Sequence, residues 1–310
     1  MTTPKPRPTS SFCRLLVPLD GSRLAEAVLP AASELARRFG AALTLLHVLE
    51  RGAPSTVHGE PHLAAAAAAA AYLTGLSRKL AASGLTVDVH VHPNQERDVA
   101  GSIVGHADEL RCDLVILATH GHGGLRDVVV GSIAQQVLRR GTRPVLLMRP
   151  RFAAGRLFVV RKLLVPLDGT PDSERALPVA EELARAWDAE AILLQVVPTR
   201  GSLAGEQAAV AAMLPSATAA ALEIERERAS EHLSALAEGL RARGIAASAE
   251  VLRGDPTTVV PETVRREGAD FVVMATHGRA GLDAFWSGSI GARLVERLAV
   301  PILIFRSDRP

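Results

Sequence analysis

Residues 15–21 read LLVPLDG, and residues 163–169 repeat this stretch letter for letter. Because motifs that recur in one fixed order indicate duplication of a whole domain, the chain is predicted to hold two copies of one domain. A length of 310 residues also suits two domains. The further matched pairs are ATHG at 118–121 and 275–278, GSI at 131–133 and 288–290, and PVLLM and PILIF from Pro144 and Pro301.

The repeat sets the expected domain boundaries. Both copies begin just before LLVPLDG and end just after the last apolar run. Between them lies a stretch of arginine, glycine and small residues that breaks the pattern. We predict a disordered N-terminus over residues 1–10, a first domain over 11–150, a linker over 151–160 and a second domain over 161–308.

Short apolar runs alternate with stretches of helical pattern in each copy. The first copy offers the runs CRLLVPL, LTLLHVL, LTVDVHV, DLVILA and PVLLM, and the second offers KLLVPL, AILLQVV, AASAEV, DFVVMA and PILIF. Helices are expected between them, over about 22–39, through the alanine-rich tract to about 83, over about 96–110 and from about 131. Continuous apolar runs suit strands covered on both faces. The pattern predicts an α/β fold with two tandem open parallel sheets of five strands and helices on both faces.

Composition excludes several classes of protein. A formal net charge of +2 and an aromatic content of 3% leave little material for an electrostatic or stacking surface, so we expect no nucleic-acid partner. No apolar run is long enough to span a bilayer, and the N-terminal residues lack the apolar stretch of a secretory signal. Two cysteines cannot form a disulfide framework. We therefore expect a cytoplasmic protein with no membrane association.

Two places in each copy carry candidate binding chemistry. Asp20 and Asp168 follow the first strand, where parallel sheets bind ligands, and a carboxylate there can accept hydrogen bonds from a ribose; the alternative is a helix N-cap. The loop after the fourth strand reads THGHGGLRDVVVGSI in one copy and THGRAGLDAFWSGSI in the other. Its glycines and the helix that it opens favour a phosphate, and the alternative is a flexible turn.

These motifs resemble the universal stress protein family over nearly the whole chain. The family's ATP-binding signature is Gly, two residues, Gly, nine residues and Gly-Ser or Gly-Thr. Gly121 is followed by nine residues and Gly131-Ser132, and the second copy repeats that spacing. The first glycine of the signature is replaced by Ala118 and Ala275. The resemblance implies a Rossmann-like fold of the adenine nucleotide alpha hydrolase-like type with strand order 3-2-1-4-5.

The resemblance also implies ATP as the cofactor, with Mg²⁺ brought by the triphosphate. The residue pair before each aspartate would flank the adenosine together with that aspartate, a valine backbone would meet the adenine edge, and the loop would hold phosphates. The histidine of each loop either forms a hydrogen bond with the ligand or packs within the loop, and both alternatives stay open. The nucleotide-binding residues are then Pro18, Leu19, Asp20, Val48, Ala118, His120, Gly121, Gly131, Ser132 and Ile133, and Pro166, Leu167, Asp168, Val196, Ala275, His277, Gly278, Gly288, Ser289 and Ile290.

Three functions stay open at this point. The first is an ATP-binding regulatory protein of the stress response, which we favour because the matched loops contain no lysine and no matched arginine to catalyse phosphoryl transfer. The second is a slow ATPase or autophosphorylating enzyme with Ser132 or Ser289 as acceptor. The third is a nucleotide-free scaffold. The Walker, dinucleotide-binding and nucleophile-elbow motifs are absent from the sequence.

Histidines and cysteines invite a metal or redox interpretation. His90 and His92 share a strand face, but Glu250 stands where the second copy would need a histidine, so we predict solvated histidines and no metal site shared by both copies. Cys13 and Cys112 precede two strands that the family places side by side. We favour two unrelated thiols over a redox pair.

The final apolar strands raise the question of partners. Uncovered apolar sheet edges promote aggregation. In the family, fifth strands of two domains pair, so the resemblance implies pairing of the two halves within the chain and leaves a homodimer open. A client protein is expected but not identified by the sequence.

Overall fold

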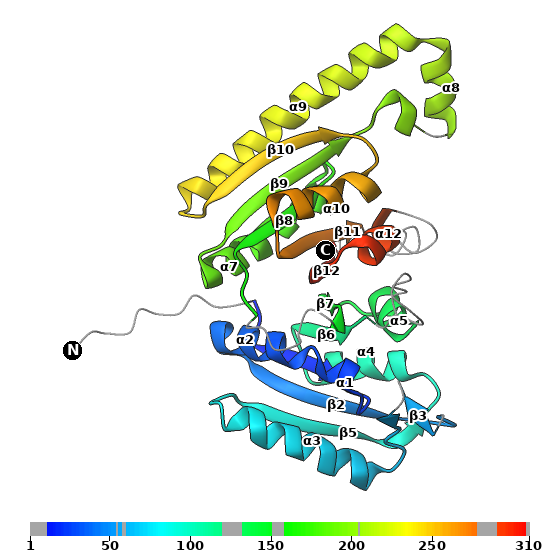
Figure 1. Ribbon diagram of the computed structural model, residues 1–310, viewed down its shortest axis with the longest axis vertical. Coiled ribbons are helices and arrows are strands. Elements are labelled where there is room, and N and C mark those ends of the chain that lie inside the picture. Colours follow the sequence, from blue (N-terminus) through cyan, green and yellow to red (C-terminus); the bar gives the residue numbers. More distant parts are fainter. Residues whose placement is uncertain are drawn as a thin grey trace, which may run out of the picture. The chain divides into compact units, whose positions relative to one another are not determined.

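The computed structural model describes residues 11–53, 55–57, 60–119, 132–150, 158–203, 205–277 and 290–307. These residues form two compact units, unit 1 up to Phe158 and unit 2 from Val159. Strands alternate with helices in both units (Figure 1). In the part of the chain so described, no helix combines the length and the apolar character needed to cross a bilayer.

Unit 1 is built around five parallel strands. Their order is β5-β2-β1-β6-β7, which places the first strand in the middle and is 3-2-1-4-5 when these five are counted along the chain. Helices connect them, as parallel pairing requires. The elements are β1 (Arg14–Pro18), α1 (Arg23–Glu26), α2 (Leu29–Phe39), β2 (Ala42–Glu50), α3 (Ala66–Ala81), β5 (Val87–Glu96), α4 (Val99–Glu109), β6 (Leu114–Ala118), α5 (Ser132–Arg140) and β7 (Val145–Met148).

Unit 2 repeats this arrangement with one enlarged connection. Its order is β10-β9-β8-β11-β12, and the pairs are again parallel. Between β9 and β10 the chain forms η2, α8 and the long α9. The elements are β8 (Lys162–Leu167), α6 (Pro171–Glu174), α7 (Ala176–Trp187), β9 (Glu190–Val197), η2 (Arg200–Ser202), α8 (Gly205–Met213), α9 (Pro215–Ala242), β10 (Ala247–Arg253), α10 (Pro256–Glu267), β11 (Phe271–His277), α12 (Ile290–Arg297) and β12 (Ile302–Ser307).

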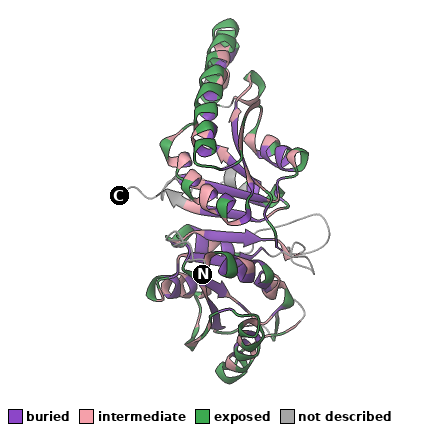
Figure 2. Cartoon of the chain, turned by 90° about the vertical axis from the view of Figure 1, so that its left-hand side faces the viewer, coloured by how far each residue is buried: buried purple, intermediate pink, exposed green. Residues whose placement is uncertain are grey.

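The central strands form the core of each unit. All five residues of β6 are buried, and Leu15, Leu16 and Val17 of β1 are fully shielded from solvent. In Figure 2 the central strands are coloured as buried, whereas the helices show exposed residues on their outer faces. The outer strands β5 and β10 contain only intermediate and exposed residues. The predicted α/β class with tandem parallel, Rossmann-like domains is confirmed, and the expected burial on both faces holds for the central strands.

Three predicted details were wrong. Unit 1 has more than five strands because β3 (Thr56–Val57) and β4 (Glu60–Pro61) pair as an antiparallel hairpin of their own. The predicted helix over 22–39 is split into α1 and α2, since a proline at the start of α2 lacks the N–H that would continue the first turn. Strand β5 runs on to Glu96, and α4 begins only after Asp98, whose side chain caps it.

The alanine-rich tract forms the first turns of a surface helix. Residues 64–68 are exposed, and α3 turns inward only from Ala69, with Leu73 and Leu76 also buried. Alanine tolerates both environments, because it is a strong helix former and only weakly apolar.

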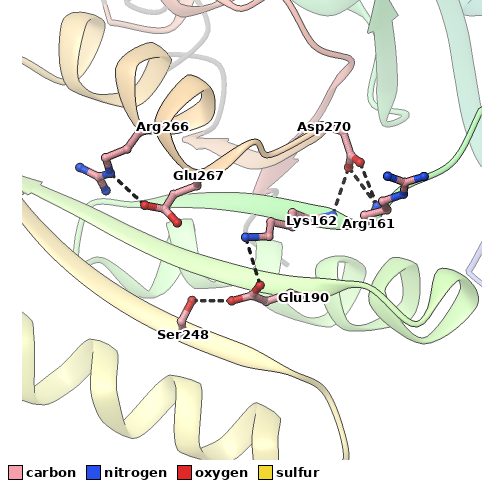
Figure 3. A network of polar contacts seen from close by, with 7 residues as sticks. All are labelled: Arg161, Lys162, Glu190, Ser248, Arg266, Glu267 and Asp270. Carbon is pink, nitrogen blue, oxygen red and sulfur yellow. Dashed lines mark hydrogen bonds and ion pairs between the residues drawn. The ribbon is translucent and has the colours of Figure 1, made fainter.

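An aspartate at the start of the fourth main strand holds the first strand in both units. In unit 1, Asp113 Oδ2 accepts hydrogen bonds from the backbone N–H groups of Cys13 (2.8 Å) and Arg14 (2.9 Å). In unit 2, Asp270 accepts from the N–H groups of Arg161 (3.0 Å) and Lys162 (3.2 Å), as Figure 3 shows. The repeated contact therefore fixes the register of two strands whose carboxyl ends build the sites.

Asp113→Ala should lower the free energy of unfolding of unit 1 by about 1–3 kcal/mol, because two backbone donors lose a charged acceptor. Asp108→Ala is the matched control. Its pair with Arg143 (3.0 Å) is half exposed, and surface pairs contribute about 1 kcal/mol or less. Urea unfolding of the full chain measures both variants. Equal losses in the two would contradict a specific role for Asp113.

Candidate functional site

A pocket of about 220 Å³ lies where β1, β2 and β6 of unit 1 end. It collects side chains from these strand ends, from α4, from the start of α5 and from the segment after the β3–β4 hairpin. Open parallel sheets bind ligands at this edge. The lining residues are Pro18, Leu19, Asp20, Ala25, Leu46, His47, Val48, Glu50, His62, Val99, Ile103, Leu117, Ala118, Ser132, Ile133 and Ala134.

Asp20 uses one carboxylate oxygen for structure. Its Oδ1 accepts hydrogen bonds from the backbone N–H (2.9 Å) and hydroxyl (2.7 Å) of Ser22, which is itself the N-cap of α1. No hydrogen bond to Oδ2 is present within the described residues, so Oδ2 is available to a ligand. The alternative role of Asp20 as a helix N-cap is wrong, since the N-cap of α1 is Ser22 and Asp20 supports that residue through Oδ1. The ribose contact stays a prediction.

Val48 lies at an interruption of the sheet. The pairing of β2 with β5 shifts register between Val48 and Glu50. Such bulges leave backbone groups outside the ladder and occur next to binding sites. A backbone edge can therefore meet a planar ligand at Val48, which is itself a lining residue.

His47 ties the two sides of the pocket together. The side chain is buried, with Nδ1 2.7 Å from the carbonyl oxygen of Leu19 and Nε2 3.0 Å from that of Leu63. Both partners only accept, so the ring donates to both as an imidazolium and to one as a neutral ring.

Leu63 also explains why the LLVPLDG motif of unit 1 ends in a glycine, Gly21. A Cβ on Gly21, which has a φ of 92°, would lie 2.7 Å from Leu63 Cδ1.

The first turn of α5 closes the far end of the pocket. Ser132 opens this helix, as the prediction of a helix start near 131 requires, and Ile133 and Ala134 also line the pocket. The first N–H groups of a helix have no partner within it, and the helix dipole there favours anions. The lining of the pocket therefore includes carboxylate acceptors, Asp20 and Glu50, and the first turn of a helix, where the dipole favours anions.

The structure brings together seven of the ten residues predicted for the first copy: Pro18, Leu19, Asp20, Val48, Ala118, Ser132 and Ile133. Seven predicted positions lie outside the described residues: His120, Gly121, Gly131, Gly278, Gly288, Ser289 and the side chain of His277. Sequence reasoning missed the apolar wall from α4, Val99 and Ile103, and the polar residues His47, Glu50 and His62. The prediction of the binding residues relied on the repeated glycine-containing motifs, and none of these five residues lies in such a motif.

Unit 2 differs at the equivalent place. Asp168 Oδ1 accepts from the N–H (2.9 Å) and hydroxyl (2.6 Å) of Thr170, as Asp20 does from Ser22. A groove of about 890 Å³ lies beside it, lined also by Gly169, Gln195 and residues of α6 and α9. Among the residues that the structure describes there, Pro166, Leu167, Val196 and Ala275 do not line this groove, and Ile290 is placed only as the start of α12.

The histidines of β5 were predicted to be solvated, and the structure shows them half-buried beside His106 of α4. His92 Nδ1 lies 3.4 Å from His106 Nε2, and His92 Nε2 lies 3.0 Å from Glu96 Oε1. The rings of His90 and His106 lie with their centroids 4.6 Å apart and their planes inclined at 55°, and burial together with these neighbours lowers the pKa of His90. Over the described ranges, no group of three or more side chains is arranged to hold a metal ion.

The cysteines show contrasting environments. Cys112 is buried, and burial raises the pKa of its thiol to about 11, which keeps it protonated and inert. Cys13 is exposed, and no disulfide joins the two.

The single tyrosine of the chain, Tyr72, should titrate only on unfolding. Its hydroxyl donates to Glu26 Oε1 (3.0 Å), and burial, followed by the charge of Glu26, raises its pKa far above the ordinary value of about 10. Because the folded pKa is raised, this stabilisation is complete below about pH 10 and is lost as the pH rises further. Ultraviolet absorbance of tyrosinate should rise together with the loss of helical circular dichroism. Ionisation near pH 10 in the folded chain would contradict this environment.

Comparison with known proteins identifies the fold and the family. The sequence profile of the Universal stress protein family matches residues 11–149 and 160–306. A universal stress protein of Mycolicibacterium smegmatis is 24% identical over 311 residues, which cover 94% of this chain and 96% of that protein. One of Methanocaldococcus jannaschii is 27% identical over 149 residues, 48% of this chain and 84% of that protein.

Solved structures agree with the sequence match. A universal stress protein from Archaeoglobus fulgidus superimposes with a TM-score of 0.68 at 17% identity, over 95% of this chain and 98% of that one. A second, from Pseudomonas aeruginosa, gives a TM-score of 0.62 at 16% identity, over 95% and 93%. At these identities the likeness concerns the fold. With both halves matched by the same profile, the chain belongs to the universal stress protein family.

Proposed function

We propose that this protein is an ATP-binding regulatory protein of the stress response whose unit 1 pocket holds the nucleotide. One observation carries the proposal: the free oxygen of Asp20, the bulge at Val48 and the start of α5 all border one pocket. These are the groups that a ribose, a base edge and a phosphate need. Val99 and Ile103 add the apolar wall against which a base can lie.

The residues present fit ATP in the order adenosine to phosphate. Asp20 Oδ2 accepts from a ribose hydroxyl, because a carboxylate accepts and does not donate. The backbone at Val48 meets the base edge, and the N–H groups of Ser132 and Ile133 bind phosphate oxygens. Mg²⁺ accompanies the triphosphate, since this hard cation is commonly held through phosphate oxygens together with few protein ligands.

The proposed role is binding rather than catalysis. Phosphoryl transfer requires positioned cations and a group that orients the nucleophile. The described lining of the pocket contains two carboxylates and two histidines but no lysine or arginine. ATP occupancy would then act by changing the surface offered to a client protein in the cytoplasm, and hydrolysis or autophosphorylation at Ser132 would be incidental.

The two units are proposed to bind with different affinity. In unit 2, Gln195 takes the place of His47, and its Oε1 is buried with no hydrogen-bond partner among the described residues. The β3–β4 hairpin of unit 1 has no equivalent among the described elements between β9 and β10, where η2 and α8 lie instead. The described part of unit 2 therefore lacks the hairpin segment through which His62 lines the unit 1 pocket, and we expect the tighter site in unit 1.

Denaturing the purified protein and identifying the released small molecules tests the proposal against its alternatives. Adenine nucleotide in the supernatant, together with phosphate release that is negligible over hours in added ATP, supports binding. Steady phosphate release indicates an ATPase, and ³²P retained on the chain indicates autophosphorylation. Neither bound nor bindable nucleotide would favour the scaffold.

A further inference from the structure

Three histidine rings of unit 1 lie together between β5 and α4. His90 and His92 are alternate residues of β5 and share one face of that strand, and His106 belongs to α4. The ring centroid of His106 is 4.6 Å from that of His90 and 5.0 Å from that of His92. His106 is buried, whereas the side chain of His92 is 19% exposed, so solvent reaches one edge of the group.

The outer hydrogen-bond partners fix the tautomers of two of these rings. His106 Nδ1 lies 2.7 Å from the carbonyl oxygen of Ser102, and His92 Nε2 lies 3.0 Å from Glu96 Oε1. Both oxygens only accept, so these two nitrogens carry the hydrogens. In the neutral rings, His92 Nδ1 and His106 Nε2 therefore carry lone pairs, and they lie 3.4 Å apart. Two acceptors cannot bond to each other, so this pair of nitrogens requires a cation between them.

The spacing of the two nitrogens suits a metal ion better than a shared proton. Ordinary hydrogen bonds from a nitrogen are about 2.7–3.2 Å long, shorter than the 3.4 Å observed. Two Zn–N bonds of about 2.0–2.1 Å at a tetrahedral angle place their nitrogens about 3.3–3.4 Å apart. Histidine ligands of metals commonly donate their other ring N–H to a carboxylate or a backbone carbonyl, and Glu96 and Ser102 supply one of each.

Unit 2 forms the corresponding elements without these histidines. Leu252 takes the place of His92 in the pairing of the outer strand, β10 with β9. Thr263 takes the place of His106 when α4 and α10 are aligned on their aspartate N-caps. The fold therefore does not need imidazole rings at these two positions, and the feature belongs to unit 1.

We infer that His92 and His106 bind a divalent transition-metal ion of the zinc type, with His90 and water completing its coordination. The inference goes beyond the proposed function and does not rest on it. The described side chains place only two nitrogens at the ion, so His90 becomes a ligand by a change of rotamer. Imidazole suits zinc, nickel and copper, whereas magnesium prefers oxygen ligands.

Calorimetry of the untagged full chain with zinc chloride, in buffer free of nucleotide, tests the site. Wild type should bind zinc saturably, and magnesium should not compete. Removing an outer partner typically weakens metal binding by about 10- to 100-fold, so Glu96→Ala should show that loss. His92→Leu and His106→Thr, which copy the residues of unit 2, each remove a ligand and should weaken binding by more than about tenfold.

His232→Gln is the matched control. His232 Nε2 also contacts a carboxylate, Glu174 Oε1 at 2.7 Å, but lies in unit 2, so this variant should bind zinc as wild type does. Cobalt gives a second readout, since the visible absorption of tetrahedral cobalt should appear with wild type and with His232→Gln and be lost in His92→Leu.

Two results would overturn the inference. One is a wild-type chain that binds no zinc, in which case a shared proton alone joins the two rings. The other is an unchanged zinc affinity in a folded His92→Leu or His106→Thr chain, which would place any bound zinc elsewhere. Thermal melting without metal establishes which variants are folded, and either of the two suffices for the test.

Discussion

Gly131→Val should weaken ATP binding at the unit 1 site by about three orders of magnitude. Gly131 immediately precedes α5, whose first turn lines the pocket, and it is the glycine of the repeated GSI motif. It lies outside the described residues, so the expectation rests on this position in the sequence. A bulky side chain would occupy the space of a phosphate. Each charge-assisted bond to a backbone N–H contributes about 1.5–3 kcal/mol, and losing two or three gives the stated effect.

The matched change in the other copy is Gly288→Val. Calorimetric titration of wild type, both single variants and the double variant should resolve which unit carries which site. The tighter site should disappear only in Gly131→Val and in the double variant. If Gly288→Val instead removed the tighter site, the assignment of that site to unit 1 would be wrong.

Asp20→Asn should weaken ATP binding by about tenfold to a hundredfold. Asparagine keeps an oxygen for the N–H and hydroxyl of Ser22, so the start of α1 is preserved. The second oxygen becomes an NH₂ group, which donates and cannot accept from a ribose hydroxyl. A hydrogen bond to a charged group contributes about 1.5–3 kcal/mol, which corresponds to the stated loss.

A ligand lacking both ribose hydroxyls makes the complementary change. Wild type should bind 2′,3′-dideoxy-ATP as weakly as Asp20→Asn binds ATP, and the variant should bind the two ligands with similar affinity. Asp168→Asn is the control, since it makes the same change in unit 2. An undiminished preference of Asp20→Asn for ATP over the dideoxy analogue would rule out the ribose contact.

The repeat made most of the fold and half of the site predictable. Because LLVPLDG and the GSI motif recur, Asp20 and Ser132 could be assigned to strand and helix ends that meet at one edge of the sheet. Continuous apolar runs such as residues 14–18 report burial on both faces, so the parallel strands followed. The split of the first helix at Pro30 could have been predicted from the missing N–H of proline.

The remaining features depend on contacts between distant residues. His62 sits in a segment without periodicity, and nothing local marks it as buried until Glu50 and the hairpin are brought beside it. Asp113 and Asp270 stand directly before a strand, where a polar residue is common, so the sequence does not single them out. Each accepts hydrogen bonds from the start of the first strand only because the first and fourth strands of the unit pair. His106 was not singled out, since a histidine on a helix shows no sign of the two histidines that meet it from β5.

The two units differ in the residues that lie beside the glycine of their LLVPLDG motifs. In unit 1, His47 forms hydrogen bonds with the carbonyl oxygens of Leu19 and Leu63 and so connects the end of β1 to the segment after the hairpin. In unit 2, the side-chain carbonyl oxygen of Gln195 is buried and has no partner in the part of the chain that the structure describes. Gly169, like Gly21, has a positive φ, and a Cβ on it would lie 2.9 Å from Gln195 Nε2. Both units thus keep the glycine, but the residue that packs beside it differs. This agrees with the expectation that one site per chain binds the nucleotide more tightly.

Calorimetric titration of the wild-type full chain with magnesium–ATP is the direct test of ATP binding in the unit 1 pocket. We expect saturable binding, with a tighter site that is weakened by Asp20→Asn and unaffected by Asp168→Asn. A folded wild-type chain that gives no saturable heat at millimolar ATP would contradict it.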